Sequence, residues 1–209
     1  MKDNEIIIPA GSQELYGKLE IPAGADSLVI FSHGSGSSRF SKRNNYVAEL
    51  LNKQNMATLL IDLLTAKEDT EFENRFDIEL LTERLTEITL YMRELQETRD
   101  LKTVYFGAST GAASALGAAA RLGSLIKAVV SRGGRPDLAT HSLEKVKSPT
   151  LLIIGSLDTE VIKLNEHAYE MLSCEKRMEI VKGASHLFEA PGKLDEVAKL
   201  AGNWFKKHI

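Results

Sequence analysis

The stretch that decides the fold is residues 104–112, Val-Tyr-Phe-Gly-Ala-Ser-Thr-Gly-Ala. Its apolar start predicts a buried strand over residues 103–107, and the small residues at its end begin a helix. Between strand and helix, Ser109 stands on a tight turn of the kind that holds a serine hydroxyl above the edge of a sheet. Gly107 and Gly111 flank this turn without the Cβ atoms that would clash in it. Ser109 is therefore the candidate nucleophile.

The pentapeptide Gly-x-Ser-x-Gly is a weak signal when taken alone, because roughly one chain in fifteen of this length contains it by chance. The alternative interpretation of Ser109 is a tight turn without reactivity. The order of strand, turn and helix around the serine favours chemistry, because a nucleophilic serine needs that setting.

Strand and helix patterns alternate along the rest of the chain. The clearest helix covers residues 78–95, where apolar residues recur at spacings of three and four. We expect strands at residues 5–9, 14–21, 28–32, 57–62, 103–107, 126–131, 150–155 and 177–181, and helices at 42–52, 78–95, 112–122, 161–172 and 194–206, with a short helix between the sixth and seventh strands. The first two strands are joined by a turn at Gly11-Ser12, so they pair antiparallel. The remaining alternation predicts an α/β fold, a mostly parallel sheet with helices on both faces, in which Trp204 of the last helix lies in the core.

A nucleophilic serine needs a histidine base and an acid that orients the base, and where the serine stands on a strand–turn–helix of this kind they follow it in the order acid, then histidine. Asp158 comes three residues after Gly155, where a buried strand ends. His186 comes shortly after the last strand. The carboxyl ends of parallel strands share one edge of a sheet, so we expect Ser109, Asp158 and His186 to meet there.

Each of the two partners also has a structural alternative. Asp158 is well placed to be the N-cap of the next helix, in which case Glu160 would be the acid. For His186 the alternative is a loop histidine that hydrogen-bonds to the backbone.

The loop His33-Gly34-Ser35-Gly36-Ser37-Ser38 follows the strand at residues 28–32, and its glycines let the backbone approach a developing oxyanion. We expect the oxyanion hole to consist of the Thr110 N–H and the Ser35 N–H, with Gly36 as the next candidate for the second donor and as a substrate-binding residue. The alternatives are a glycine-serine turn without a ligand and a phosphate loop. The phosphate interpretation lacks the Lys-Ser/Thr ending of a P-loop and the Gly-x-Gly-x-x-Gly spacing of a dinucleotide loop.

Taken together, four segments resemble the α/β-hydrolase superfamily and, within it, the small dienelactone-hydrolase-like branch. They are His33-Gly34-Ser35-Gly36, Gly107-Ala108-Ser109-Thr110-Gly111, Gly155-Ser156-Leu157-Asp158 and Gly183-Ala184-Ser185-His186. Residues 61–65 and 130–138 are also similar to bacterial members of this branch. The resemblance implies a hydrolase fold, a catalytic set of Ser109, Asp158 and His186, and no cofactor. Dienelactone hydrolases use a cysteine nucleophile, so the serine at position 109 favours a serine esterase.

Arg132 and Arg135 follow the strand at residues 126–131, at the same edge as Ser109, where they could hold an anionic group of the substrate. The structural alternative for both arginines is a salt bridge with Asp137 or with the acidic residues of 68–73. The argument for substrate binding applies in a weaker form to Arg39 and Arg43, which follow the loop at residues 33–38.

The connection between the sixth and seventh strands is too short for a cap domain. We therefore expect hydrolysis of small soluble esters or lactones through an acyl-enzyme. A catalytically silent ligand-binding module and an acyltransferase with the same triad are the alternatives.

The composition fits one soluble domain over residues 1–209, with 43% hydrophobic and 26% charged residues. A formal net charge of -3 provides no positive field for nucleic acid. No apolar window is long enough to span a membrane, and no signal-peptide pattern precedes the first strand, so we expect a cytoplasmic protein. The single cysteine, Cys174, is expected to be structural, the expected partner is a small-molecule substrate, and the oligomeric state stays open.

Overall fold

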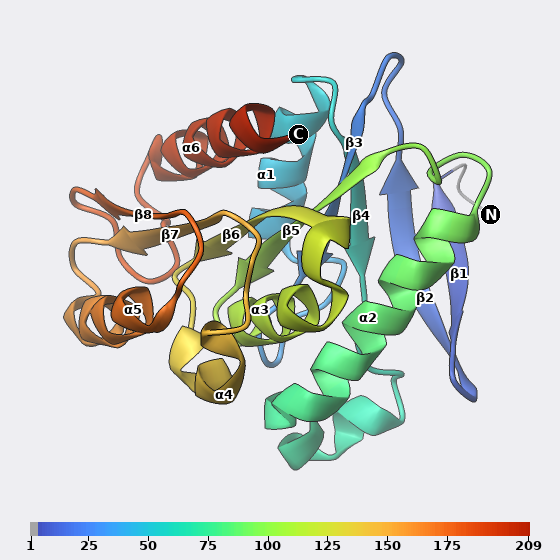
Figure 1. Ribbon diagram of the computed structural model, residues 1–209, viewed down its shortest axis with the longest axis horizontal. Helices are drawn as coiled ribbons and strands as arrows, with labels where there is room; N and C mark the ends of the chain where they lie inside the picture. Colours follow the sequence, from blue (N-terminus) through green and yellow to red (C-terminus); the bar gives the residue numbers. More distant parts are fainter. Residues whose placement is uncertain (1–3) are drawn as a thin grey trace.

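The computed structural model describes residues 4–209; residues 1–3 of the expected domain lie outside the described residues. The chain forms an eight-stranded sheet in the order β1-β2-β4-β3-β5-β6-β7-β8 (Figure 1). The strands are β1 (Glu5–Ala10), β2 (Gln13–Glu20), β3 (Ser27–Ser32), β4 (Ala57–Ile61), β5 (Lys102–Ala108), β6 (Ile126–Arg132), β7 (Thr150–Gly155) and β8 (Lys176–Val181). β2 pairs antiparallel with β1 and β4, and the other neighbours are parallel. The expected α/β fold is confirmed.

Helices cover both faces of this sheet: α1 and α6 lie on one side, and α2, α3 and α5 lie on the other (Figure 1). The helices are α1 (Lys42–Asn52), α2 (Ile78–Glu94), α3 (Gly111–Leu122), α4 (Thr140–Leu143), α5 (Thr159–Met171) and α6 (Lys193–His208), with short 3-10 turns η1 (Glu68–Thr70), η2 (Phe72–Phe76), η3 (Gly123–Leu125) and η4 (Pro136–Ala139). Every expected strand begins and ends within one residue of the observed strand. α5 begins two residues before the expected start at Val161, because its exposed first residues carry no apolar signal.

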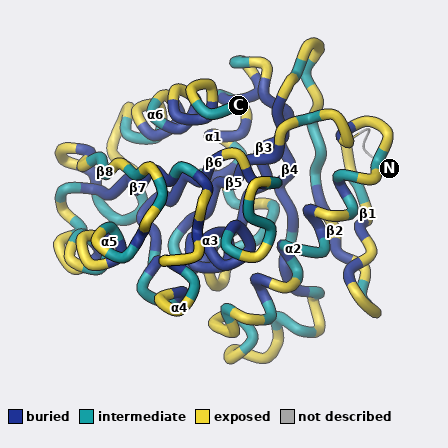
Figure 2. The backbone as a smooth tube through the Cα atoms, in the orientation of Figure 1, coloured by how far each residue is buried: buried dark blue, intermediate teal, exposed yellow. Residues whose placement is uncertain are grey.

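The central strands bury both of their faces (Figure 2). On β5, Phe106 packs against Phe31 of β3 on the side of α1 and α6, with ring centroids 4.9 Å apart. Tyr105 points to the opposite side, where its hydroxyl lies 2.6 Å from the Thr89 hydroxyl of α2. A strand covered on both faces is held firmly, so the turn at the end of β5 has a fixed position.

Trp204 of α6 is buried among apolar side chains under this helix, and its indole N–H donates to the Pro149 carbonyl at 3.3 Å. Its expected place in the core is confirmed. None of the helices within residues 4–209 has the length and apolar character needed to cross a membrane.

Candidate active site

Ser109 lies directly after β5 with a φ of 52°, a left-handed backbone conformation that is uncommon for residues other than glycine. Its backbone is held from both sides. The Ser109 N–H donates to the Arg132 carbonyl at 3.2 Å, and the Ser109 carbonyl accepts from the N–H of Arg135 at 3.0 Å and from that of Ala112 at 3.0 Å. Strain of this kind is retained where the surrounding structure holds it in place, and it is common at functional sites.

The two glycines that flank the turn are required by close packing. A Cβ at Gly111 would lie 2.2 Å from the Ser32 carbonyl oxygen, and a Cβ at Gly107 would lie 2.5 Å from Cα of Ala112. α3 therefore starts directly against the end of β3. The loop after β3 approaches the serine just as closely, since a Cβ at Gly34 would lie 3.0 Å from Cβ of Ser109.

Asp158 and His186 form a hydrogen-bonded pair: a carboxylate oxygen of Asp158 lies 2.6 Å from Nδ1 of His186. The Asp158 side chain is 15% exposed and that of His186 is 35% exposed. Asp158 stands at the N-cap position of α5, yet its side chain accepts no capping hydrogen bond, so the capping interpretation is wrong. Glu160, the alternative acid, is exposed and pairs with Lys163 at 3.2 Å.

The turn that carries Asp158 and the loop that carries His186 are tied together by the backbone. The Leu157 N–H donates to the Ala184 carbonyl at 3.0 Å, and the Gly183 N–H donates to the Ser156 hydroxyl at 2.8 Å. A Cβ at Gly155 would lie 2.3 Å from the Ala184 carbonyl oxygen, so the close approach of the two segments requires a glycine there. These contacts hold the acid and the histidine at a fixed separation.

Ser109 lies against Arg132, the last residue of β6, and His186 lies against the next residue, Gly133. The Arg132 carbonyl accepts from the Ser109 N–H, and a Cβ at Gly133 would lie 3.5 Å from the His186 ring. The structure thus brings the three residues of the expected triad to one edge of the sheet.

The two expected oxyanion donors lie together, but the Ser35 N–H already has a protein acceptor and is not a free donor for an oxyanion. The Ser35 N–H donates to the Thr110 hydroxyl at 2.7 Å, while within residues 4–209 the Thr110 N–H donates to no protein acceptor. Gly36 is exposed, with a φ of 66°. A Cβ added at Gly36 would lie 3.9 Å from the guanidinium of Arg75, its nearest neighbour.

Arg135 and Arg132 have different surroundings. Arg135 makes a two-point ion pair with Asp137, at 2.9 and 2.8 Å, which is the structural alternative considered above. Arg132 is 4% exposed, and its guanidinium donates to the neutral Asn44 amide oxygen at 3.3 Å. Its Nε is buried without a partner among the described residues. Burial, and then the nearby charge of Arg43, lower the pKa of Arg132 to about 10.

The other two arginines near this edge have acidic neighbours. Arg39 pairs with Asp62 at the end of β4, and Arg43 lies 3.8 Å from a carboxylate oxygen of Glu189. Both pairs fit a structural role for these arginines.

His33 has a role that sequence reasoning did not find. The Leu63 N–H donates to His33 Nε2 at 3.3 Å, so the hydrogen is on Nδ1, which donates to the Gly34 carbonyl at 3.0 Å. Burial of the imidazole lowers the pKa of His33, and the ring is neutral in this arrangement. A neutral His33 therefore fixes the loop that leads to Ser35. The only signal for it in the sequence is its place at a strand end.

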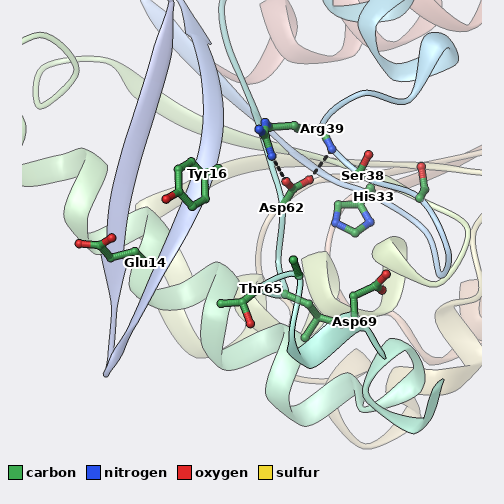
Figure 3. Close-up of a pocket in the computed structure, with 11 residues that line it drawn as sticks. Glu14, Tyr16, His33, Ser38, Arg39, Asp62, Thr65 and Asp69 are labelled. Atoms are coloured by element: carbon green, nitrogen blue, oxygen red, sulfur yellow. Dashed lines mark hydrogen bonds and ion pairs between the residues drawn. The ribbon is translucent and has the colours of Figure 1, made fainter. Parts of the chain in front are cut away.

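A cavity of about 230 Å³ opens beside this loop (Figure 3). Asp62 is among its lining residues and accepts from the Arg39 N–H at 2.6 Å, while Tyr16 and Glu14 of β2 line one side. The complete lining is Glu14, Tyr16, His33, Ser37, Ser38, Arg39, Asp62, Leu64, Thr65, Ala66 and Asp69. These residues come from segments far apart in the chain, so no local pattern could have grouped them.

Comparison with known proteins places this geometry in a family. No family model matches the chain. Over its full length the chain is 49% identical to a Mycobacterium tuberculosis protein named "Putative phosphoribosyl transferase", of which the match spans 47%. The chain therefore spans about half the length of the curated relatives it matches.

Two solved structures show the same fold over the whole chain. Est1E from Butyrivibrio proteoclasticus superposes with a TM-score of 0.84 at 15% identity, covering 99% of each chain. Dienelactone hydrolase from Anabaena variabilis ATCC 29413 superposes with a TM-score of 0.96. It is 51% identical, over 98% of this chain and 97% of that one. The chain therefore belongs to the dienelactone hydrolase branch of the α/β-hydrolase superfamily.

Proposed function

We propose that this chain is a serine hydrolase that cleaves small soluble carboxylic esters or lactones through an acyl-enzyme on Ser109. The observation that carries the proposal is the hydrogen bond of 2.6 Å between His186 and Asp158, at the same sheet edge as a serine on a strained turn. A nucleophile, an acid and a base that follow one another in this chain order are the components of acyl transfer.

In the proposed reaction Ser109 Oγ attacks the ester carbonyl carbon while its proton passes to His186 Nε2. Asp158 accepts the Nδ1–H of His186, which fixes the tautomer that leaves Nε2 free to take the proton. The carbonyl oxygen becomes an oxyanion beside the Thr110 N–H. The C–O bond then breaks, the leaving alcohol receives the proton from Nε2, and water repeats the sequence on the acyl-enzyme to release the acid.

The architecture supports a small substrate. Between β6 and β7 the described chain forms only the short elements η4 and α4, where a cap over the site would require an insertion. An uncovered site has little apolar wall for a long acyl chain.

Arg132 is our proposed contact for an anionic group on the substrate, and Arg135 is not. Among residues 4–209 the buried Arg132 guanidinium has no carboxylate partner and contacts only the neutral Asn44 amide oxygen and the Phe188 ring, so an incoming anion would offset its charge. Arg135 already has Asp137 as its partner.

The name of the Mycobacterium tuberculosis relatives does not change this proposal. The match spans 47% of those proteins, so the transferase activity in their name has no assigned place in the matching half. The serine on a strained turn and the hydrogen-bonded pair of His186 and Asp158 support acyl chemistry.

The test is hydrolysis of p-nitrophenyl acetate and butyrate by the purified protein, with Ser109→Ala alongside. A serine-directed phosphonate followed by intact mass shows whether Ser109 is nucleophilic. Turnover and a single label in the wild type, with neither in Ser109→Ala, would support the proposal. A folded wild type that is as inert and unlabelled as the variant would overturn it and favour a binding module. Ester products formed from an added alcohol would instead indicate an acyltransferase.

A further inference from the structure

The hydroxyl of Thr110 is placed differently from that of an ordinary helix-capping threonine. Thr110 is 4% exposed and stands at the N-cap position of α3. A threonine there usually accepts a hydrogen bond from the first turn of its own helix, but the Thr110 side chain makes no such bond. It accepts instead from the Ser35 N–H, 75 residues away in sequence, at 2.7 Å.

This arrangement leaves the N–H and the O–H of Thr110 without a protein acceptor among the described residues, next to the nucleophile. Within the described residues neither the Thr110 N–H nor the Thr110 O–H donates to a protein acceptor. Both belong to the residue after Ser109, and the loop that carries Ser35 approaches Ser109 closely at Gly34. Buried donors without acceptors destabilise a protein, so their retention at this position favours a ligand that accepts from them.

We infer that the Thr110 hydroxyl is itself a catalytic hydrogen-bond donor to the oxyanion of the Ser109 reaction, and this inference rests on the proposed function. An oxygen that accepts from the Thr110 N–H is within reach of the hydroxyl on the same residue. The hydroxyl can keep the Ser35 N–H as its donor while it donates its own hydrogen to the oxyanion. Such a chain of hydrogen bonds strengthens the last donor, because each bond polarises the next.

Thr110 thus joins the two sides of the oxyanion hole. The Thr110 N–H and O–H face the developing charge directly, and the Ser35 N–H acts on it through the hydroxyl. The stabilisation by these hydrogen bonds grows as negative charge develops on the carbonyl oxygen. It therefore lowers the energy of the transition state more than that of the bound substrate, and it affects kcat more than KM.

The experiment compares Thr110→Val with Thr110→Ser in p-nitrophenyl butyrate hydrolysis. Valine keeps the branched shape and removes the hydroxyl, whereas serine keeps the hydroxyl. We expect Thr110→Val to lower kcat by about 10- to 100-fold with KM changed less than about threefold, and Thr110→Ser to retain kcat within about threefold. Thr110→Ala, which relieves any crowding by valine, should lose as much as Thr110→Val. The matched control is Thr86→Val on α2, remote from the site, which should leave kcat unchanged.

A second substrate separates donation from positioning of the loop. In a thionoester the carbonyl oxygen is replaced by sulfur, which is a weak acceptor, so the loss in Thr110→Val should shrink to about threefold or less if the hydroxyl donates to the oxyanion. Equal losses with ester and thionoester, an effect on KM alone, or full activity in folded Thr110→Val would overturn the inference. Labelling of Ser109 by the phosphonate separates a failure of this inference about Thr110 from a failure of the proposed function. A labelled, active wild type with an insensitive Thr110→Val removes only the role of Thr110, whereas an unlabelled, inert wild type removes both.

Discussion

The carboxylate of Asp158 lies 2.6 Å from Nδ1 of His186, although the two residues are 28 positions apart in the chain. The turn after β7 and the loop after β8 meet in backbone hydrogen bonds, so the distance is set by the backbone as well as by the side chains. This relationship makes the acid of the proposed triad directly testable.

Asp158→Asn should lower kcat by about 10³- to 10⁴-fold while the protein stays folded, because an amide no longer holds the imidazole in the correct tautomer. The measurement is steady-state hydrolysis of p-nitrophenyl acetate with a thermal melt as the fold check. Glu160→Gln is the matched control, since Glu160 is exposed and paired with Lys163. Loss of activity in Glu160→Gln with little change in Asp158→Asn would reverse the assignment.

Gly111→Ala should destabilise the protein by about 3 kcal/mol, because the new methyl group would lie 2.2 Å from the Ser32 carbonyl oxygen and force β3 and α3 apart. The free energy of unfolding in urea measures this. Ala120→Gly in the same helix is the control and should cost about 1 kcal/mol. If Gly111→Ala unfolds no more easily than the control, the close contact between α3 and β3 is wrong.

Stability should fall as the pH is lowered below about 6.5, the ordinary pKa of histidine, because His33 stays neutral in the fold while the unfolded chain takes up a proton. Because the pKa of His33 is lower in the folded protein than in the unfolded chain, the protein keeps its full stability above about pH 6.5 and loses stability as the pH falls below it. The slope from this one group is at most about 1.4 kcal/mol per pH unit. Urea unfolding between pH 5 and 7.5 measures it.

His33→Gln should flatten this pH dependence. Burial also lowers the pKa of His208, so the comparison is best made in a His208→Gln background. An unchanged slope in His33→Gln would contradict the neutral, hydrogen-bonded His33 described above.

Arg132→Met should lower kcat/KM for mono-p-nitrophenyl succinate by about 10- to 100-fold and that for p-nitrophenyl butyrate by less than threefold, since only the succinate carries a charge for the guanidinium. Removing a buried charge that has no carboxylate partner among residues 4–209 should leave the free energy of unfolding unchanged or raise it. Arg135→Met is the control, because Arg135 is engaged with Asp137. Equal losses on both substrates would show that Arg132 supports the fold of the site and does not select anions.

The sequence by itself determined the elements of this protein and the order of its chemical groups. The apolar runs of β5 and β7, the helical spacing of α2 and the small residues around Ser109 are local patterns, and steric preferences over a few residues are enough to interpret them. The meeting of Ser109, Asp158 and His186 at one edge then followed from parallel strands, since their carboxyl ends must lie together.

Only the tertiary structure decided how the side chains of that edge are paired. It paired Arg135 with Asp137 and placed the Thr110 hydroxyl at the Ser35 N–H instead of at its own helix. It also buried Arg132 without a carboxylate partner among residues 4–209. Such choices depend on distances of a few tenths of an ångström between the ends of different strands. Because residues far apart in the chain share these distances, no local pattern encodes them.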